Sequence, residues 1–84
     1  MKTVPELIAQ HFNVAPAIID DSLKIADLHP DEIDCAEVVM QLEDEYGIDL
    51  LGDAVTDVWL TGTVGDLVRL VKERAPGMAW MGVL

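Results

Sequence analysis

The sequence predicts an all-α domain, and three observations lead to this fold class. Hydrophobic residues recur every three or four positions in several segments, which is the spacing of one face of a helix. No segment alternates hydrophobic and polar residues with the period of two that is typical of a strand. Hydrophobic residues also make up 51% of the 84 residues, which is enough for one modest core in a single domain.

The first helix is expected from Thr3 to about Asn13. Its hydrophobic positions follow the helical period, and they are Val4, Leu7, Ile8 and the pair His11 and Phe12. Pro5 suits the first turn, where its missing N–H costs nothing. The dipeptide Ala15-Pro16 then interrupts the pattern.

The connection from residue 14 to residue 30 is long but contains many hydrophobic side chains. These residues are Val14, Ile18, Ile19, Leu23, Ile25 and Leu28. A connection of this composition is expected to lie across the core, because solvent would otherwise surround all six side chains.

The second helix is expected to begin at Pro30-Asp31, with Asp31 as the N-cap residue. Glu32 and Asp34 would add two more anions at the positive end of the helix dipole. The helix is expected to end at Gly47, in a left-handed C-cap. The residues expected to form its buried stripe are Ile33, Ala36, Val39, Leu42 and Tyr46.

The pattern over residues 51–61 is compatible with a short third helix or with an irregular loop. Thr63 and Asp66 form a capping-box pattern that predicts a last helix, which Pro76-Gly77 would end. We therefore expect a helical bundle over residues 1–76 and an apolar tail over residues 77–84. The tail could dock onto the bundle or serve as an exposed partner-binding peptide.

Charge is the strongest compositional signal of the chain. Sixteen acidic residues against five basic ones give a net charge of −11, and no Lys or Arg occurs between Lys24 and Arg69. Such a field repels nucleic acid and attracts basic protein surfaces. No run of about 20 apolar residues is present, so no membrane span is expected, and a monomeric cytoplasmic protein is the simplest interpretation.

The chain offers no recognisable catalytic set and no metal site. It has one cysteine, Cys35, and the nearby carboxylates should raise the pKa of its thiol. His11 and His29 lack partners at ligand spacing and are interpreted as ordinary surface residues. We therefore expect a protein that is not an enzyme.

Three stretches together resemble the acyl carrier protein family over about residues 3–74. They are HFNVAPAIIDDSLKIADL, DEIDCAEVVMQLEDEYGIDL and TVGDL. The resemblance implies a four-helix bundle of three longer helices and one short helix, with a groove that shelters an acyl chain. It also implies 4'-phosphopantetheine on the serine of an Asp-Ser-Leu triplet that opens the second helix.

This chain departs from the family at that triplet, which reads Asp31-Glu32-Ile33. The preceding glycine of the family is replaced by His29-Pro30. A carboxylate cannot form the phosphodiester, so no covalent cofactor is expected at Glu32. Ser22 lies in another triplet of the family's form, Asp21-Ser22-Leu23, but the helix register places the family's serine at position 32.

The resemblance also implies a partner-binding face on the second helix. Its residues would be Asp31, Glu32, Asp34, Glu37, Met40 and Asp44. Glu32 could simply stabilise the helix start, or it could mimic the phosphate of a modified carrier.

The leading hypothesis is a non-catalytic, carrier-like module. It would bind basic-surfaced enzymes of fatty acid, polyketide, peptide or lipid biosynthesis through its acidic second helix. The alternatives are a working carrier, with phosphopantetheine on Ser22 or as an altered form of a serine-bearing parent, and an acidic adaptor unrelated to carriers.

Overall fold

The computed structural model describes residues 2–50 and 52–75, and this part of the chain is a four-helix bundle. The helices are α1 (Val4–Phe12), α2 (Glu32–Tyr46), α3 (Asp53–Thr61) and α4 (Val64–Arg74). Two short 3-10 helices, η1 (Pro16–Ile18) and η2 (Ile25–Leu28), lie in the connection between α1 and α2. Within these ranges no strand forms, and no helix has the length and apolar character needed to cross a membrane. The all-α prediction is confirmed.

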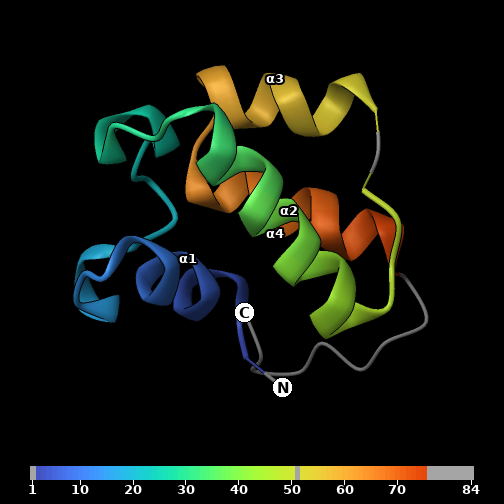
Figure 1. The fold of residues 1–84 in the computed structure, drawn as a ribbon, viewed down its shortest axis with the longest axis horizontal. Helices are drawn as coiled ribbons and strands as arrows, with labels where there is room; N and C mark the ends of the chain where they lie inside the picture. Colours follow the sequence, from blue (N-terminus) through green and yellow to red (C-terminus); the bar gives the residue numbers. More distant parts are fainter. Residues whose placement is uncertain (1, 51, 76–84) are drawn as a thin grey trace.

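The helices are arranged around one shared core. α1 packs against α2 and α4, whereas α3 packs against η2 and α4. α1 and α3 lie on opposite sides of α2 (Figure 1). α2 is the longest helix with 15 residues, and α1 is as short as α3, with nine residues each.

Three of the four helices begin with the same reciprocal capping arrangement. The pairs are Thr3 with Glu6 in α1, Asp31 with Asp34 in α2, and Thr63 with Asp66 in α4. In each pair the first side chain accepts the backbone N–H of the second residue, and the second side chain accepts the N–H of the first. Two otherwise unpaired donors are thereby satisfied at each helix start. The caps predicted at Asp31 and Thr63 are confirmed, as is the left-handed Gly47 that ends α2.

The buried face of α2 differs from the prediction. Leu42 and Tyr46 are buried as expected, and Val39 is partly buried, but Ile33 is 64% exposed and Ala36 is also exposed. The residues that face the core are Cys35, Val38, Val39, Leu42 and Tyr46. This set keeps one helical stripe, from which Ile33 is displaced by about half a turn at 3.6 residues per turn. Ile33 is therefore free for contacts outside the bundle.

The connection between α1 and α2 does lie across the core. Ile19 and Ile25 are buried, and three of the other apolar residues are partly buried, while Ile18 remains exposed, contrary to expectation. Those three residues are Val14, Leu23 and Leu28.

Backbone hydrogen bonds tie this connection to the junction between α3 and α4. The N–H of Ile25 donates to the carbonyl of Gly62 at 3.2 Å, and the N–H of Val64 donates to the carbonyl of Leu23 at 2.9 Å. The N–H of Gly65 donates to the carbonyl of Asp21, also at 2.9 Å. A Cβ atom at Gly65 would lie only 3.0 Å from that carbonyl oxygen, so glycine permits the close approach.

The stretch that the sequence left ambiguous contains α3. Val55 and Trp59 are buried on its inner face, and the Trp59 ring stacks on Phe12 with their centroids 6.3 Å apart. The predicted boundary of the bundle near residue 76 and the two alternatives for the tail, docking or partner binding, lie outside the described residues.

The cap of α4 generates a prediction about acid stability. The N–H of Thr63 donates to the Asp66 carboxylate at 3.0 Å and, together with the nearby Arg69, lowers the pKa of that carboxyl below its usual 3.8. A lowered pKa in the folded state stabilises the fold above pH 3.8, and the effect is lost as the pH falls through the folded-state pKa. Asp66→Asn should therefore lower the unfolding midpoint in urea near pH 6 and have much less effect near pH 2.5.

The matched control is Asp57→Asn, which removes an exposed carboxylate from α3. A loss of stability in Asp66→Asn that is equally large at both pH values would contradict the proposed role of the carboxylate charge.

Candidate functional site

The start of α2 gathers several of the acidic residues predicted to form the site. His29 ends η2 in a left-handed conformation, with φ 53° and ψ 51°, and Pro30 leads into the helix. Asp31 is the N-cap residue and Glu32 is the first helical residue, and both side chains are exposed. Because the N-terminus of a helix is its positive end, these carboxylates lie in a favourable field.

Asp34, in the first turn of α2, is more enclosed than its neighbours. Its carboxylate accepts the backbone N–H of Asp31 at 2.9 Å and also contacts the His11 ring. The hydrogen bond from Asp31 is the main cause that lowers the pKa of Asp34 from 3.8, and the His11 contact adds to it.

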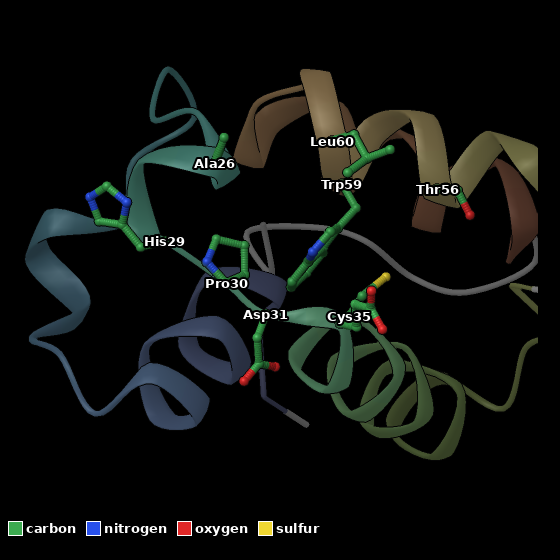
Figure 2. Close-up of a pocket in the computed structure, with 9 residues that line it drawn as sticks. Ala26, His29, Pro30, Asp31, Cys35, Thr56, Trp59 and Leu60 are labelled. Atoms are coloured by element: carbon green, nitrogen blue, oxygen red, sulfur yellow. The ribbon is translucent and has the colours of Figure 1, made fainter.

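A pocket of about 620 Å³ lies beside the start of α2. Residues of η2, α2, α3 and the η2–α2 connection line this open pocket, with Trp59 reaching from α3 toward the beginning of α2 (Figure 2). The residues that line it are Ala26, His29, Pro30, Asp31, Glu32, Cys35, Thr56, Trp59 and Leu60. The pocket therefore combines an apolar interior with two carboxylates.

Seven of the nine lining residues were not predicted as site residues from the sequence. They are Ala26, His29, Pro30, Cys35, Thr56, Trp59 and Leu60. Three belong to α3, which the hydrophobic pattern did not distinguish from a loop. The one available signal was the tryptophan, because a large aromatic residue in a short polar-flanked segment commonly packs against something.

An exposed stripe runs along the outer face of α2. It comprises Ile33, Glu37, Met40 and Asp44, at helical positions i, i+4, i+7 and i+11. Ile33 is 64% exposed and Met40 is 62% exposed. We call these four residues the α2 stripe. Three of them were predicted to contact partners, whereas Ile33 was expected to be buried.

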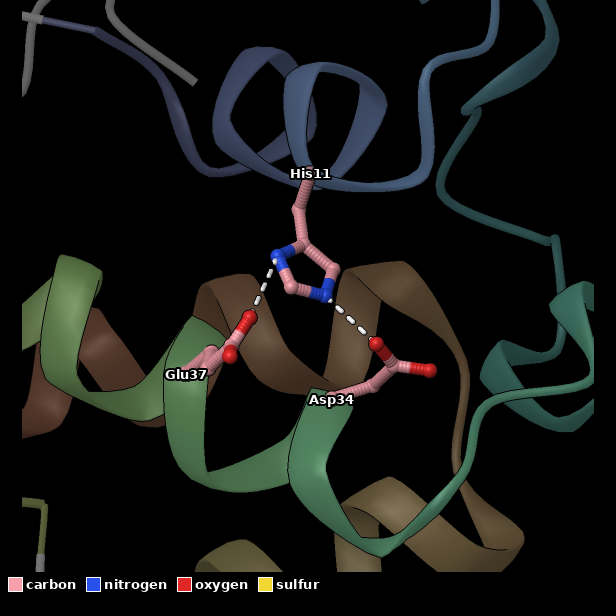
Figure 3. A group of neighbouring side chains, drawn as sticks. All are labelled: His11, Asp34 and Glu37. Carbon is pink, nitrogen blue, oxygen red and sulfur yellow. Dashed lines mark hydrogen bonds and ion pairs between the residues drawn. The ribbon is translucent and has the colours of Figure 1, made fainter.

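The position of His11 also differs from the expectation. It lies in the last turn of α1, and its ring is placed between two carboxylates of α2 (Figure 3). Nε2 is 2.7 Å from Oδ1 of Asp34, and Nδ1 is 3.7 Å from Oε2 of Glu37. The interpretation of His11 as a surface residue without partners is therefore wrong. Its partners are 23 and 26 positions away, so local spacing could not reveal them.

Ser22 lies in a turn and not at a helix start. Both its hydroxyl and its backbone N–H donate to Oδ1 of Asp20, at 2.7 Å and 2.9 Å. These bonds lower the pKa of the Asp20 carboxyl from 3.8, with the hydroxyl contributing most. The side chain is exposed, but it is separated from the start of α2 by the whole of η2.

Cys35 lines the pocket and is only partly exposed. Burial raises the pKa of its thiol above 9.0. The direction agrees with the expectation from sequence, but the cause is desolvation and not the neighbouring carboxylates. A thiol with a raised pKa is a poor nucleophile at neutral pH, because the thiolate is the reactive form.

A small acidic four-helix domain with an apolar pocket at the start of its second helix has the architecture of a carrier protein. The chain is 42% identical over 72 residues to the acyl carrier proteins of Rickettsia typhi and Rickettsia prowazekii, and 40% identical to that of Rickettsia massiliae. In each case the match covers 84% of this chain and 80% of the relative. No family model matches the sequence. On the strength of these relatives, the chain belongs to the acyl carrier protein family, which sets aside the alternative of an adaptor unrelated to carriers.

The raised pKa of Cys35 predicts slow modification by thiol reagents. At pH 7.5 the second-order rate with a disulfide reagent should be several-fold below that of a small free thiol with an ordinary pKa near 8.5, and it should rise steeply above pH 9. Urea should remove the difference by exposing the thiol. A native rate equal to that of the small thiol at pH 7.5 would contradict the desolvation of Cys35.

Proposed function

We propose that this chain is a carrier-like interaction module that has no covalent phosphopantetheine and binds biosynthetic enzymes through α2. The observation that carries the proposal is the identity and position of Glu32. It is the first residue of α2, it is exposed, and it borders the pocket. The resemblance to the family puts the attachment serine at this position. A cytoplasmic monomer that performs no catalysis of its own fits this role.

The chemistry of position 32 supports a function without an attached cofactor. Attachment of phosphopantetheine requires a hydroxyl group that can form a phosphodiester, and a carboxylate has none. A carboxylate at the first helical position is also compatible with the fold, because the helix dipole favours negative charge there. Glu32 would thus keep one negative charge where a modified carrier has a phosphate, so that a basic partner could still be attracted.

The environment of Ser22 argues against the alternative attachment point. Its hydroxyl is engaged with Asp20, and it lies in a turn before η2. The carbonyl of the next residue, Leu23, accepts a hydrogen bond from the N–H of Val64, which holds this segment against the bundle. A modifying enzyme that recognises a helix start would find Ser22 in a different backbone setting.

Enzymatic loading tests the role of Glu32 directly. The wild-type chain, Glu32→Ser and Glu32→Gln would each be incubated with coenzyme A and a broad-specificity phosphopantetheinyl transferase, and then weighed intact. The wild type and Glu32→Gln should keep their mass, because neither has a hydroxyl at position 32. Glu32→Ser should gain the mass of one phosphopantetheine.

Ser22→Ala serves as the matched control for this experiment. A mass gain in the wild type that Ser22→Ala abolishes would show a working carrier modified at Ser22 and would overturn the proposal. Failure of a folded Glu32→Ser chain to gain mass would contradict the assignment of position 32 as the attachment position.

The α2 stripe is the part of the surface best suited to a basic protein partner. It alternates carboxylates with two exposed apolar side chains, and α2 and α3 contain no Lys or Arg. The carboxylates would steer a basic surface toward the helix, since complementary charge accelerates association. Met40 can adapt to an irregular apolar contact because its side chain is flexible. Asp31 and Glu32 would extend the same acidic surface at the helix start.

Charge substitutions on the stripe should weaken the binding of a partner enzyme captured with the wild-type chain. The double variant Glu37→Gln with Asp44→Asn should reduce affinity by about 1 kcal/mol or more, mainly through slower association. Met40→Ala should act mainly by faster dissociation. Surface plasmon resonance at low and high salt separates the two effects, because about 1 M salt screens exposed charges beyond roughly 3 Å.

A control with the same change in net charge is Asp57→Asn with Glu73→Gln, on α3 and α4. If this pair weakened binding as much as the stripe variant, the effect would be one of total charge and the stripe would not be the binding face.

A further inference from the structure

His11 is a nearly enclosed polar side chain between two helices. Only 9% of its side chain is exposed, although it lies in the last turn of α1, close to the surface. Its ring packs edge-on against Phe12, with their centroids 4.9 Å apart, and faces the first two turns of α2 (Figure 3). Burial of an imidazole is costly unless both ring nitrogens have suitable partners.

The two ring nitrogens face two carboxylates. Asp34 Oδ1 is at hydrogen-bond distance from Nε2, and the other oxygen of Asp34 accepts the backbone N–H of Asp31. The Asp34 carboxylate is thereby held in one orientation. A neutral imidazole has only one N–H. In the neutral ring whose Nε2–H donates to Asp34, Nδ1 carries a lone pair and faces Oε2 of Glu37. Nδ1 and Oε2 are then both electron-pair donors, as metal ligands must be.

The separation of these two groups is informative. Nδ1 and Oε2 of Glu37 are 3.7 Å apart, which is longer than a hydrogen bond. Two ligands on one tetrahedral zinc ion, each about 2.0–2.1 Å from the metal, are separated by about 3.3 Å. A movement of a few tenths of an ångström by the Glu37 side chain, which is 54% exposed, would close this difference.

We propose that His11 and Glu37 bind a divalent metal ion such as zinc between α1 and α2, with Asp34 orienting the histidine ring. One ligand atom from each of the three residues lies within 4.8 Å of the others. A carboxylate that accepts the outer N–H of a metal-bound histidine is the usual second partner in zinc sites, where it fixes the ring and raises its basicity. Water would complete the coordination on the exposed side.

The donor set distinguishes this site from general cation binding by an acidic surface. Magnesium and calcium prefer oxygen ligands, so a chain with a net charge of −11 attracts them without any histidine. Imidazole nitrogen favours zinc and its neighbours. The sequence has only two histidines and one cysteine, so the possible nitrogen and sulfur ligands are few. Zinc binding that persists in a large excess of magnesium and is lost when His11 is replaced would therefore indicate an imidazole ligand.

The test is a calorimetric titration of the full chain with zinc chloride in a large excess of magnesium. The wild type should bind one zinc ion per chain, and its thermal unfolding midpoint should rise with zinc concentration, because the ion binds the folded state. Glu37→Gln should reduce zinc affinity about tenfold or more, and Asp34→Asn should do so by a similar factor. His11→Gln should leave no binding above the background in magnesium.

The matched controls are His29→Asn and Cys35→Ser, which remove the other nitrogen and sulfur donors, and Glu73→Gln, which removes an exposed carboxylate elsewhere. All three should keep the wild-type affinity. Asparagine at position 29 tolerates the left-handed backbone there.

The side-chain NMR signals of the two histidines provide a readout that does not depend on the stability of any variant. In the wild type, zinc should shift the His11 ring and leave His29 unchanged. Displacement of zinc by magnesium, a shift of His29, or loss of binding in Cys35→Ser would each overturn the proposal.

Discussion

The whole arrangement depends on the chain segment at residues 21–25, which is bonded through its backbone to the start of α4. Helices of nine to fifteen residues are marginal on their own, so their stability must come from packing against one another. The segment contributes to this packing because it places the buried Ile25 in the core and positions η2 against α3. Gly65 permits the close contact, because a Cβ atom at this position would lie only 3.0 Å from the Asp21 carbonyl oxygen. The pocket exists because η2 and α3 are held together in this way beside the start of α2.

Local features of the sequence were enough to locate most helix boundaries. The caps at Asp31, Gly47 and Thr63 depend on residues within one turn of the boundary, so they could be predicted without knowledge of the fold. The buried face of α2 was less predictable, because Ile33 belongs to a hydrophobic pattern by type but lies about half a turn away from Leu42. The pattern of residues 51–61 did not decide between helix and loop, because the third helix has no side-chain N-cap and packs against η2 and α4.

The candidate site likewise has features that local sequence could predict and features that it could not. The position of Glu32 at the beginning of α2 followed from the register of one helix and its resemblance to a family. The pocket did not, because its walls come from three segments that are distant in sequence. The pairing of His11 with Asp34 was equally hidden, since it joins α1 to α2 across 23 positions. The six residues predicted to form one binding face of α2 lie in three surroundings. Asp31 and Glu32 border the pocket, and Asp34 contacts the His11 ring. The other three lie on the α2 stripe, where Glu37 also faces His11.

The absence of basic residues from α2 and α3 has a practical consequence for mapping any modification of this chain. Trypsin cleaves after lysine and arginine, so complete digestion cuts after Lys24 and next after Arg69. Everything between, residues 25–69, is released as one long peptide that contains Glu32 and Cys35. Ser22 falls in the preceding peptide. Ser22 and Glu32, the two candidate attachment positions, are thus separated by a single digestion, and peptide masses alone distinguish them.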